Sequence, residues 1–235
     1  MAGCVSGTPE EHLKTGALAF QKGDTTAAIE EFKKSIRLNK DFAPAHYNLG
    51  ICYSTPKTRD KAIEQFGKAI VHDPQYVEAY IALGQAYMRK DSLAGAVDVL
   101  QRGLALGIAP EKFYGNLGYC YLMKAVKDSA IHYYQRAIGR DSSNAEYYFN
   151  IAYLLNGPQR IDQSIAYLRM AKQRAADPLQ VSYLLGCRLL DKPNRTRKET
   201  EEGIALLEDY LARGGGEMMK TAKAREKLSQ ARLKK

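Results

Sequence analysis

The side chains that most often carry catalysis or bind metals are sparse in this 235-residue chain. Its histidines and cysteines are scattered: His12, His46, His72 and His132, then Cys4, Cys52, Cys120 and Cys187. A zinc site needs such residues at short spacings, for example His-x-x-x-His or Cys-x-x-Cys, and neither spacing occurs. We therefore expect no metal site, no cofactor and no catalytic residue set, and we predict that the protein is not an enzyme.

Two further features have a structural interpretation. The run Gly214–Gly216 lacks the Lys-Ser or Lys-Thr that follows the glycines of a phosphate-binding loop, so we interpret it as a hinge. Cys52, Cys120 and Cys187 fall on separate segments, too far apart to approach the roughly 4.4–6.8 Å Cα spacing of a disulfide. We predict that they are free thiols that fill small apolar spaces.

A period of 34 residues organises the chain. Glycine recurs at Gly16, Gly50, Gly84 and Gly118, is replaced by Ala152, and returns at Gly186. Independent columns keep the same register: Leu49, Leu83, Leu117, Ile151 and Leu185; Tyr53, Tyr87, Tyr121, Leu155 and Leu189; Ala28, Ala62, Ala96 and Ala130. Such a period is typical of repeat proteins, in which each unit buries its apolar face only against its neighbours.

The residues Leu49-Gly50, Tyr53, Ala62, Phe66, Ala69 and Pro74 resemble one complete tetratricopeptide repeat, a 34-residue helix-turn-helix unit. The resemblance implies an all-α fold, a right-handed superhelical solenoid of antiparallel helix pairs with a C-terminal capping helix. It divides the chain into about six units: 9–42, 43–76, 77–110, 111–144, 145–178 and 179–213. Close crossing of the two helices would explain glycine inside a helix, where it costs about 1 kcal/mol relative to alanine.

The ends of the array have their own signals. Residues 1–8 are expected to be disordered, and Thr8-Pro9-Glu10-Glu11 predicts a capped helix that begins at Pro9. Residues 214–235 are expected to form the glycine hinge and a basic capping helix. Between the helices of the sixth unit, the extra residues Asp191–Lys198 are polar and basic, and we expect an exposed loop.

The family resemblance also implies where a partner would bind. In such arrays the concave face is lined by the second, fifth, ninth, twelfth and thirteenth positions of each repeat. Here these positions supply an apolar, tyrosine-rich set: Leu13, Phe20, Tyr47, Ile51, Ile81, Gln85, Met88, Arg89, Lys112, Tyr119, Leu122, Met123, Phe149, Tyr153, Gln180 and Tyr183. The alternative is that neighbouring helices, or the protein's own C-terminal helix, cover several of these side chains, which then do not contact a partner.

This set favours a non-enzymatic scaffold or adaptor that binds an apolar or aromatic peptide or helix of another protein. The clamp with which co-chaperone members of the family bind a C-terminal carboxylate is not expected. Only Asn48 matches its pattern among the corresponding residues Leu13, Ala17, Asn48, Glu78 and Ala82. The sequence leaves the identity of the partner and the oligomeric state open.

Two alternatives remain. The formal charge is +9, and residues 192–235 hold twelve Lys or Arg against seven Asp or Glu, so this basic region could bind an anionic partner. Nucleic acid is not expected, because clustered aromatic platforms are lacking. Met1–Ala2–Gly3–Cys4 resembles the end of a bacterial lipoprotein signal. Lipidation of Cys4 would anchor the chain to a membrane in the bacterial periplasm, where similar six-repeat lipoproteins assist pilus or secretion assembly. Otherwise we expect a cytoplasmic protein.

Overall fold

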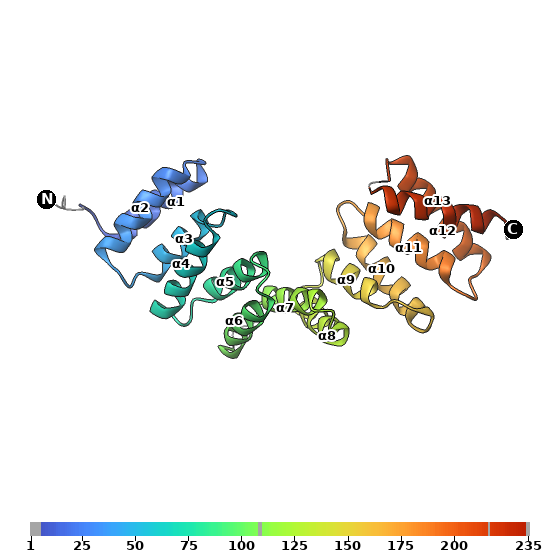
Figure 1. Cartoon of the computed structure of the whole chain (residues 1–235), viewed down its shortest axis with the longest axis horizontal. Coiled ribbons are helices and arrows are strands. Elements are labelled where there is room, and N and C mark those ends of the chain that lie inside the picture. Colours follow the sequence, from blue (N-terminus) through green and yellow to red (C-terminus); the bar gives the residue numbers. More distant parts are fainter. Residues whose placement is uncertain (1–5, 108–109, 216, 234–235) are drawn as a thin grey trace. The chain divides into compact units, whose positions relative to one another are not determined.

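The computed structural model describes residues 6–107, 110–215 and 217–233, and over these ranges the chain is helical with no strand. Thirteen α-helices and one short 3-10 helix follow one another along the described sequence (Figure 1). They group into two compact units, Met1–Ala125 and Val126–Lys235. The all-α fold predicted from the 34-residue period is therefore confirmed.

The first unit contains three helix pairs and a seventh helix. Its elements are α1 (Pro9–Gln21), α2 (Thr25–Leu38), α3 (Ala43–Cys52), α4 (Arg59–His72), α5 (Val77–Arg89), α6 (Leu93–Ala105) and α7 (Glu111–Met123). Helices α1, α3, α5 and α7 begin at residues 9, 43, 77 and 111, which are the predicted first residues of the first four repeats. Each pair packs its two helices together, and α1 contacts α3 while α5 contacts α7.

The second unit contains the remaining helices. These are α8 (Lys127–Ile138), α9 (Ala145–Leu154), the 3-10 helix η1 (Pro158–Arg160), α10 (Ile161–Arg174), α11 (Leu179–Asp191), α12 (Arg197–Ala212) and α13 (Met218–Leu233). The boundary between the units thus lies inside the predicted fourth repeat, between α7 and α8. The sequence pattern, which runs through this repeat without interruption, does not indicate the boundary.

The recurring glycine marks the contact between the two helices of a pair. A Cβ atom on Gly16 would lie 2.6 Å from the ring of Phe32, and one on Gly50 would lie 2.6 Å from the ring of Phe66. Gly186 has the same relation to a leucine, since its Cβ would lie 2.9 Å from Leu207. Because these distances are shorter than van der Waals contact, the helices approach as closely as they do only where a side chain is missing.

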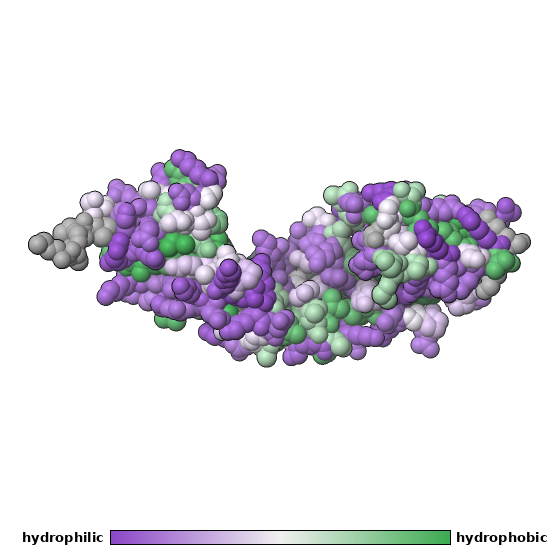
Figure 2. Space-filling view, turned by 45° about the horizontal axis from the view of Figure 1, so that its top comes forward, coloured by the Kyte–Doolittle hydropathy of each residue, from purple (hydrophilic) through white to green (hydrophobic). Residues whose placement is uncertain are grey.

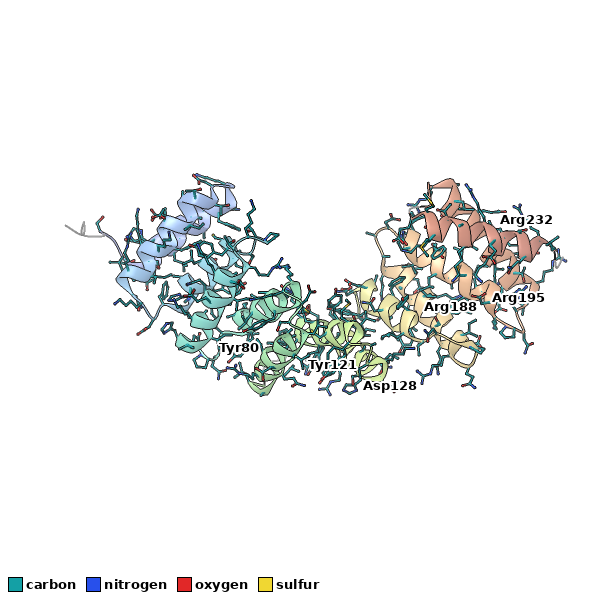
Figure 3. All side chains as sticks on the ribbon, in the orientation of Figure 1. Tyr80, Tyr121, Asp128, Arg188, Arg195 and Arg232 are labelled. Atoms are coloured by element: carbon teal, nitrogen blue, oxygen red, sulfur yellow. The ribbon has the colours of Figure 1, made fainter. Side chains whose placement is uncertain are left out.

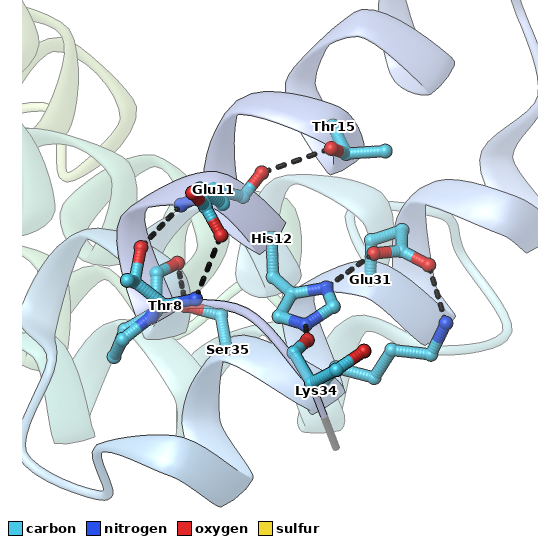
Figure 4. Close-up of polar contacts among 9 residues, drawn as sticks. Thr8, Glu11, His12, Thr15, Glu31, Lys34 and Ser35 are labelled. Atoms are coloured by element: carbon cyan, nitrogen blue, oxygen red, sulfur yellow. Dashed lines mark hydrogen bonds and ion pairs between the residues drawn. The ribbon is translucent and has the colours of Figure 1, made fainter.

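A second recurring contact joins four of the first helices, α1, α3, α5 and α9, to the segment before each of them. In these four repeats the fourth residue carries a ring with a polar atom that donates to the carbonyl oxygen six residues earlier. His12 Nε2 donates to Ser6 (2.8 Å), as Figure 4 shows. His46 Nε2 donates to Lys40 (2.9 Å), and Tyr80 and Tyr148 donate through their hydroxyls at 3.2 and 3.1 Å. His12 and His46 are therefore structural residues.

The start of α1 is capped as the sequence predicts. The Thr8 hydroxyl accepts from the Glu11 amide (3.2 Å), and the Glu11 carboxylate accepts from the Thr8 amide (2.9 Å; Figure 4). Ser6 and Thr8, which belong to the segment expected to be disordered, thus both bond to α1. Residues 1–5 lie outside the described residues.

The extra residues of the sixth repeat form a shorter loop than expected, because Asp191 belongs to α11 and Arg197 and Lys198 belong to α12. Thr196 and Glu199 form a second capping box, which starts α12 at Arg197. Lys192 Nζ lies 2.9 Å from the Asp162 carboxylate and 2.7 Å from that of Glu199. The lysine therefore links this segment to α10. Six of the eight residues are exposed as expected, and Lys192 and Arg195 are half-buried.

The three cysteines in the described residues are free thiols and are buried, as predicted. Burial raises the pKa of Cys52 and of Cys120 to about 11, and it also raises the pKa of Cys187. Because the thiolate is the reactive form, these residues are suited to packing and not to nucleophilic chemistry.

Candidate functional site

One face of α7 combines exposed apolar side chains with polar groups. Lys112, Asn116, Tyr119 and Met123 follow one another at spacings of four, three and four residues, which places them on one side of the helix. Tyr119 is 41% exposed and Met123 is 56% exposed. We call these four residues the α7 face. Figure 2 shows apolar residues (green) that reach the surface among polar ones (purple).

Asn116 is distinguished by its side-chain amide. Three repeats carry asparagine at this same position, and two of them satisfy the amide internally. Asn48 Nδ2 donates to the carbonyl of Pro44 (2.8 Å), and Asn150 Nδ2 donates to the hydroxyl of Tyr134 (3.2 Å). Asn116 Nδ2 is buried and has no hydrogen-bond partner among the described residues. A buried donor without a partner costs about 1–3 kcal/mol, which a bound acceptor would recover.

The other residues predicted for the concave face of the first unit are all at least partly accessible. Phe20 is 41% exposed, and Arg89 and Lys112 are exposed as well. The remainder are half-buried between helices: Leu13, Tyr47, Ile51, Ile81, Gln85, Met88 and Leu122. In this unit the predicted positions are thus partly exposed and mainly apolar.

Tyr47 shows how these half-buried side chains are held. Its ring lies 5.8 Å from that of Phe66 and 5.1 Å from that of Tyr76, measured between centroids. Burial among these rings raises the pKa of Tyr47, with a smaller contribution from Glu78, and raises the pKa of Tyr76 to about 12. Both phenols are therefore neutral at physiological pH and can offer a hydroxyl together with an apolar ring surface.

In the second unit, three of the four predicted residues are at least partly exposed, and the fourth, Tyr183, is buried. Tyr153 is 56% exposed on α9, and Phe149 on the same helix is half-buried. Gln180 on α11 is exposed, but its side-chain oxygen accepts a hydrogen bond from Lys220 of α13 (3.1 Å).

Tyr183 corrects the prediction from sequence. Only 8% of it is exposed, and its ring lies 4.8 Å from that of Tyr210. It belongs to an apolar cluster that includes Tyr210 of α12 and Ala224 and Leu228 of α13. The neighbouring helix α12 and the last helix both contribute to this cluster, and Tyr183 is not part of an open binding surface.

Other potential sites of chemistry are few among the described residues. Within the described ranges, no group of three or more His, Cys, Asp or Glu side chains is placed to hold a metal ion. No helix in residues 6–107, 110–215 and 217–233 is both long and apolar enough to cross a membrane. Asn48, which alone matches the carboxylate-clamp pattern, uses its amide within its own helix. Cys4, the predicted lipidation site, lies outside the described residues.

Sequence position predicts most of the α7 face but misses Asn116. This residue occupies the sixth position of its repeat, which is not among the five positions assigned to the concave face. The presence of asparagine at the same position in three repeats is a signal in the sequence, but only the structure shows that the amide of Asn116 is unpaired while those of Asn48 and Asn150 are not.

Comparison with known proteins agrees with this architecture. Two family models match, one described as TPR repeat over residues 16–55 and 60–91, the other as Tetratricopeptide repeat over residues 127–179. No curated protein matches the chain. A solved structure of the MamA protein is 28% identical, with a TM-score of 0.63, and the match covers 71% of this chain and 91% of that one.

Two further structures match nearly the whole chain at lower identity. PilF of Pseudomonas aeruginosa is 16% identical with a TM-score of 0.77, and the match covers 97% of each chain. PilW, a type IV pilus biogenesis factor, is 15% identical with a TM-score of 0.71, and the match covers 94% of this chain and 97% of that one. At these identities the similarity shows the fold. The 34-residue period, the helix pairs closed over glycine and the two family models show that this chain belongs to the tetratricopeptide repeat family.

Proposed function

We propose that this protein is a scaffold or adaptor whose α7 face binds an apolar or aromatic segment of another protein. Tetratricopeptide repeat proteins are interaction scaffolds as a family, and the proposal adds the surface and the kind of partner. The observation that carries it is the unpaired amide of Asn116 beside the exposed side chains of Tyr119 and Met123. An apolar surface with a few unsatisfied polar groups is typical of a binding site.

The contacts would divide into anchoring and orienting ones. An apolar side chain of the partner packs against Tyr119 and Met123, while Asn116 donates to a partner carbonyl. Asn116 as a whole is half-buried while its Nδ2 atom is covered, so a partner would have to reorient this amide in order to accept from it. If about 400 Å² of apolar surface is buried, the gross gain is about 10 kcal/mol, from which association subtracts several kcal/mol. We expect micromolar affinity, since 1 μM corresponds to about 8 kcal/mol.

The test compares partner capture by variants of the full chain. Proteins from the native host are retained on wild type, on Tyr119→Ala/Met123→Ala, and on the matched control Met170→Ala. Met170 is similarly exposed but lies on α10, a second helix. We expect a partner retained by wild type and the control and lost with the double variant, whose helicity and melting temperature are unchanged. Equal retention by all three proteins would refute the proposal.

Asn116→Ala provides a second, more specific measurement on the partner segment so identified. The variant should bind about tenfold more weakly, because the partner carbonyl loses its donor. It should nevertheless be no less stable, because a buried unpaired donor is removed from the free protein. Weakened binding together with lower stability would indicate a structural role for Asn116 and would contradict the role proposed here.

We also propose, as a second candidate, an envelope lipoprotein that assists assembly of a pilus or secretion complex. It is supported by the sequence Met1–Ala2–Gly3–Cys4, in which small residues precede a cysteine. Mass spectrometry of the protein from native cells tests it, because lipidation of Cys4 adds a diacylglyceryl mass to the N-terminal peptide. An unmodified Cys4 would eliminate this candidate and support the cytoplasmic location of an adaptor.

A further inference from the structure

The last helix, α13, occupies the place of a first helix in a further repeat. It packs against both α11 and α12, and Ala224, Leu228 and Ala231 are buried in that contact. If Met218 is counted as the first position, Ala224 and Leu228 fall on the seventh and eleventh positions, which Leu185 and Leu189 fill in α11.

The face of α13 that would meet a second helix has no helix against it among the described residues. In α11 this face carries Gly186, where a Cβ would lie 2.9 Å from Leu207, and Leu190, which packs against Gly203. At the equivalent eighth and twelfth positions α13 carries Arg225 and Ser229. Arg225 therefore prevents the close helix crossing that the glycine allows elsewhere, and an occupant of this face must accommodate a guanidinium group.

The structure has a groove at this place. It lies between α12 and α13, has a volume of about 570 Å³, and is lined by Glu208, Leu211, Arg225, Leu228, Ser229, Arg232 and Leu233. Four lining residues lie on one side of α13. Arg225, Ser229 and Leu233 follow one another at intervals of four, and Arg232 follows Ser229 at an interval of three. Figure 3 labels Arg232 in this last helix. We call this feature the α12–α13 groove.

The two arginines of the α12–α13 groove differ in whether they are already paired with a carboxylate. Arg232 Nη2 donates to the Glu208 carboxylate at 2.7 Å, so these two charges neutralise each other. Arg225 is exposed and makes no hydrogen bond or ion pair with the described residues. Leucine side chains border it on both helices, and one of them, Leu233, is almost fully exposed. Among the residues that the structure describes, the groove thus presents one guanidinium without an ion-pair partner, Arg225, beside an apolar wall.

We propose that the α12–α13 groove binds an acidic amphipathic helix of a partner protein. Its apolar side chains pack against Leu211 and Leu233, and one of its carboxylates pairs with Arg225. A helix fits because the groove has a helix on each side, like the place in which the second helix of a repeat packs. A carboxylate fits because Arg225 is the unpaired charge, and guanidinium and carboxylate can form two parallel hydrogen bonds. The surface is separate from the α7 face, so this proposal does not depend on the function proposed above.

Other occupants match the groove less well. A nucleic acid or an anionic membrane would bring several phosphates toward the Glu208 carboxylate and would leave the leucines without apolar contacts. A second copy of this chain would offer helices whose large apolar residues pack against glycine, and Arg225 blocks that packing.

The test uses the full chain and a displayed library of random 16-residue peptides. Peptides are selected on wild type after subtraction of those that bind Arg225→Glu, and affinities are then measured by fluorescence anisotropy. We expect enriched peptides with Leu, Ile or Phe three or four residues from Asp or Glu. They should bind Arg225→Glu at least tenfold more weakly, and a Glu→Lys change in the peptide should restore that binding.

Two controls locate the site. Lys223→Glu makes the same charge reversal as Arg225→Glu, but on an exposed residue of α13 outside the groove. It should alter the affinity for the peptide less than twofold. Tyr119→Ala should leave affinity unchanged, which separates this surface from the α7 face. The proposal is overturned if no peptide distinguishes wild type from Arg225→Glu, or if Lys223→Glu weakens binding equally. Arg225-dependent binding only to a 20-base-pair duplex or to anionic phosphatidylglycerol vesicles would also overturn it, in favour of a polyanion site.

Discussion

The close crossing of helices at glycine can be tested by adding one methyl group. In Gly50→Ala, the new Cβ would lie 2.6 Å from Cε1 and 2.7 Å from Cδ1 of Phe66. Phe66 is only 1% exposed, and its ring also contacts Tyr47, so it has little room to move. Gly67→Ala is the matched control, because Gly67 lies inside α4 and a Cβ there would meet nothing within 4 Å.

The two substitutions should change stability in opposite directions. Alanine is favoured over glycine inside a helix by about 1 kcal/mol, and Gly67→Ala should gain this amount. Gly50→Ala gains the same amount but incurs an overpacking cost of about 1–3 kcal/mol. A cost in the middle of that range leaves a net loss of about 1 kcal/mol, so the free energies of unfolding of the two variants should differ by about 2 kcal/mol.

Urea unfolding followed by circular dichroism at 222 nm measures this difference. Near-ultraviolet circular dichroism reports whether the packing of Tyr47 against Phe66 has changed, which we expect for Gly50→Ala and not for Gly67→Ala. If Gly50→Ala proves as stable as Gly67→Ala, the helices can separate without cost, and the explanation given for the 34-residue glycine period is wrong.

Two further predictions concern the second unit. Bonding to Lys192 and to the Thr196 amide holds the pKa of Glu199 at about 2, below its ordinary 4.5, so its stabilising effect is complete above pH 4.5 and is lost as the pH falls toward 2. Thermal unfolding of Glu199→Gln should therefore depend less on pH over this interval than that of wild type, and parallel profiles would contradict the assignment. Tyr210 is completely buried and its hydroxyl has no hydrogen-bond partner among the described residues, so Tyr210→Phe should raise the free energy of unfolding by about 1 kcal/mol. A loss of stability in urea unfolding would reveal a partner for that hydroxyl.

The fold is predictable from sequence because each of its main contacts recurs at a fixed interval. Gly16 and Gly50 report the same helix crossing, and the repeat starts at Pro9 and Ala43 follow from that register. A periodic signal of this kind records what is common to all units. It does not record what distinguishes one unit from another, which is where binding surfaces arise.

Asn116 and Tyr183 illustrate this limit. The sixth position of three repeats is asparagine, at Asn48, Asn116 and Asn150. Whether each amide has a hydrogen-bond partner depends on the residues around it. Tyr183 occupies a position assigned to the concave face, yet it is buried in a cluster with residues of α12 and α13. This burial follows from where these two helices pack, and no residue near Tyr183 in the sequence indicates it.

The burial of Tyr183 has a consequence for the integrity of the chain. Helix α13 covers a continuous cluster that includes Tyr183, Cys187, Leu190, Ile204 and Leu207. Proteolytic loss of that helix would uncover the side of this cluster that packs against Ala224, Leu228 and Ala231, and exposed apolar patches promote association between molecules. The C-terminal helix thus acts as a safeguard against aggregation, and the shelf life of the purified protein will depend on keeping residues 218–233 intact.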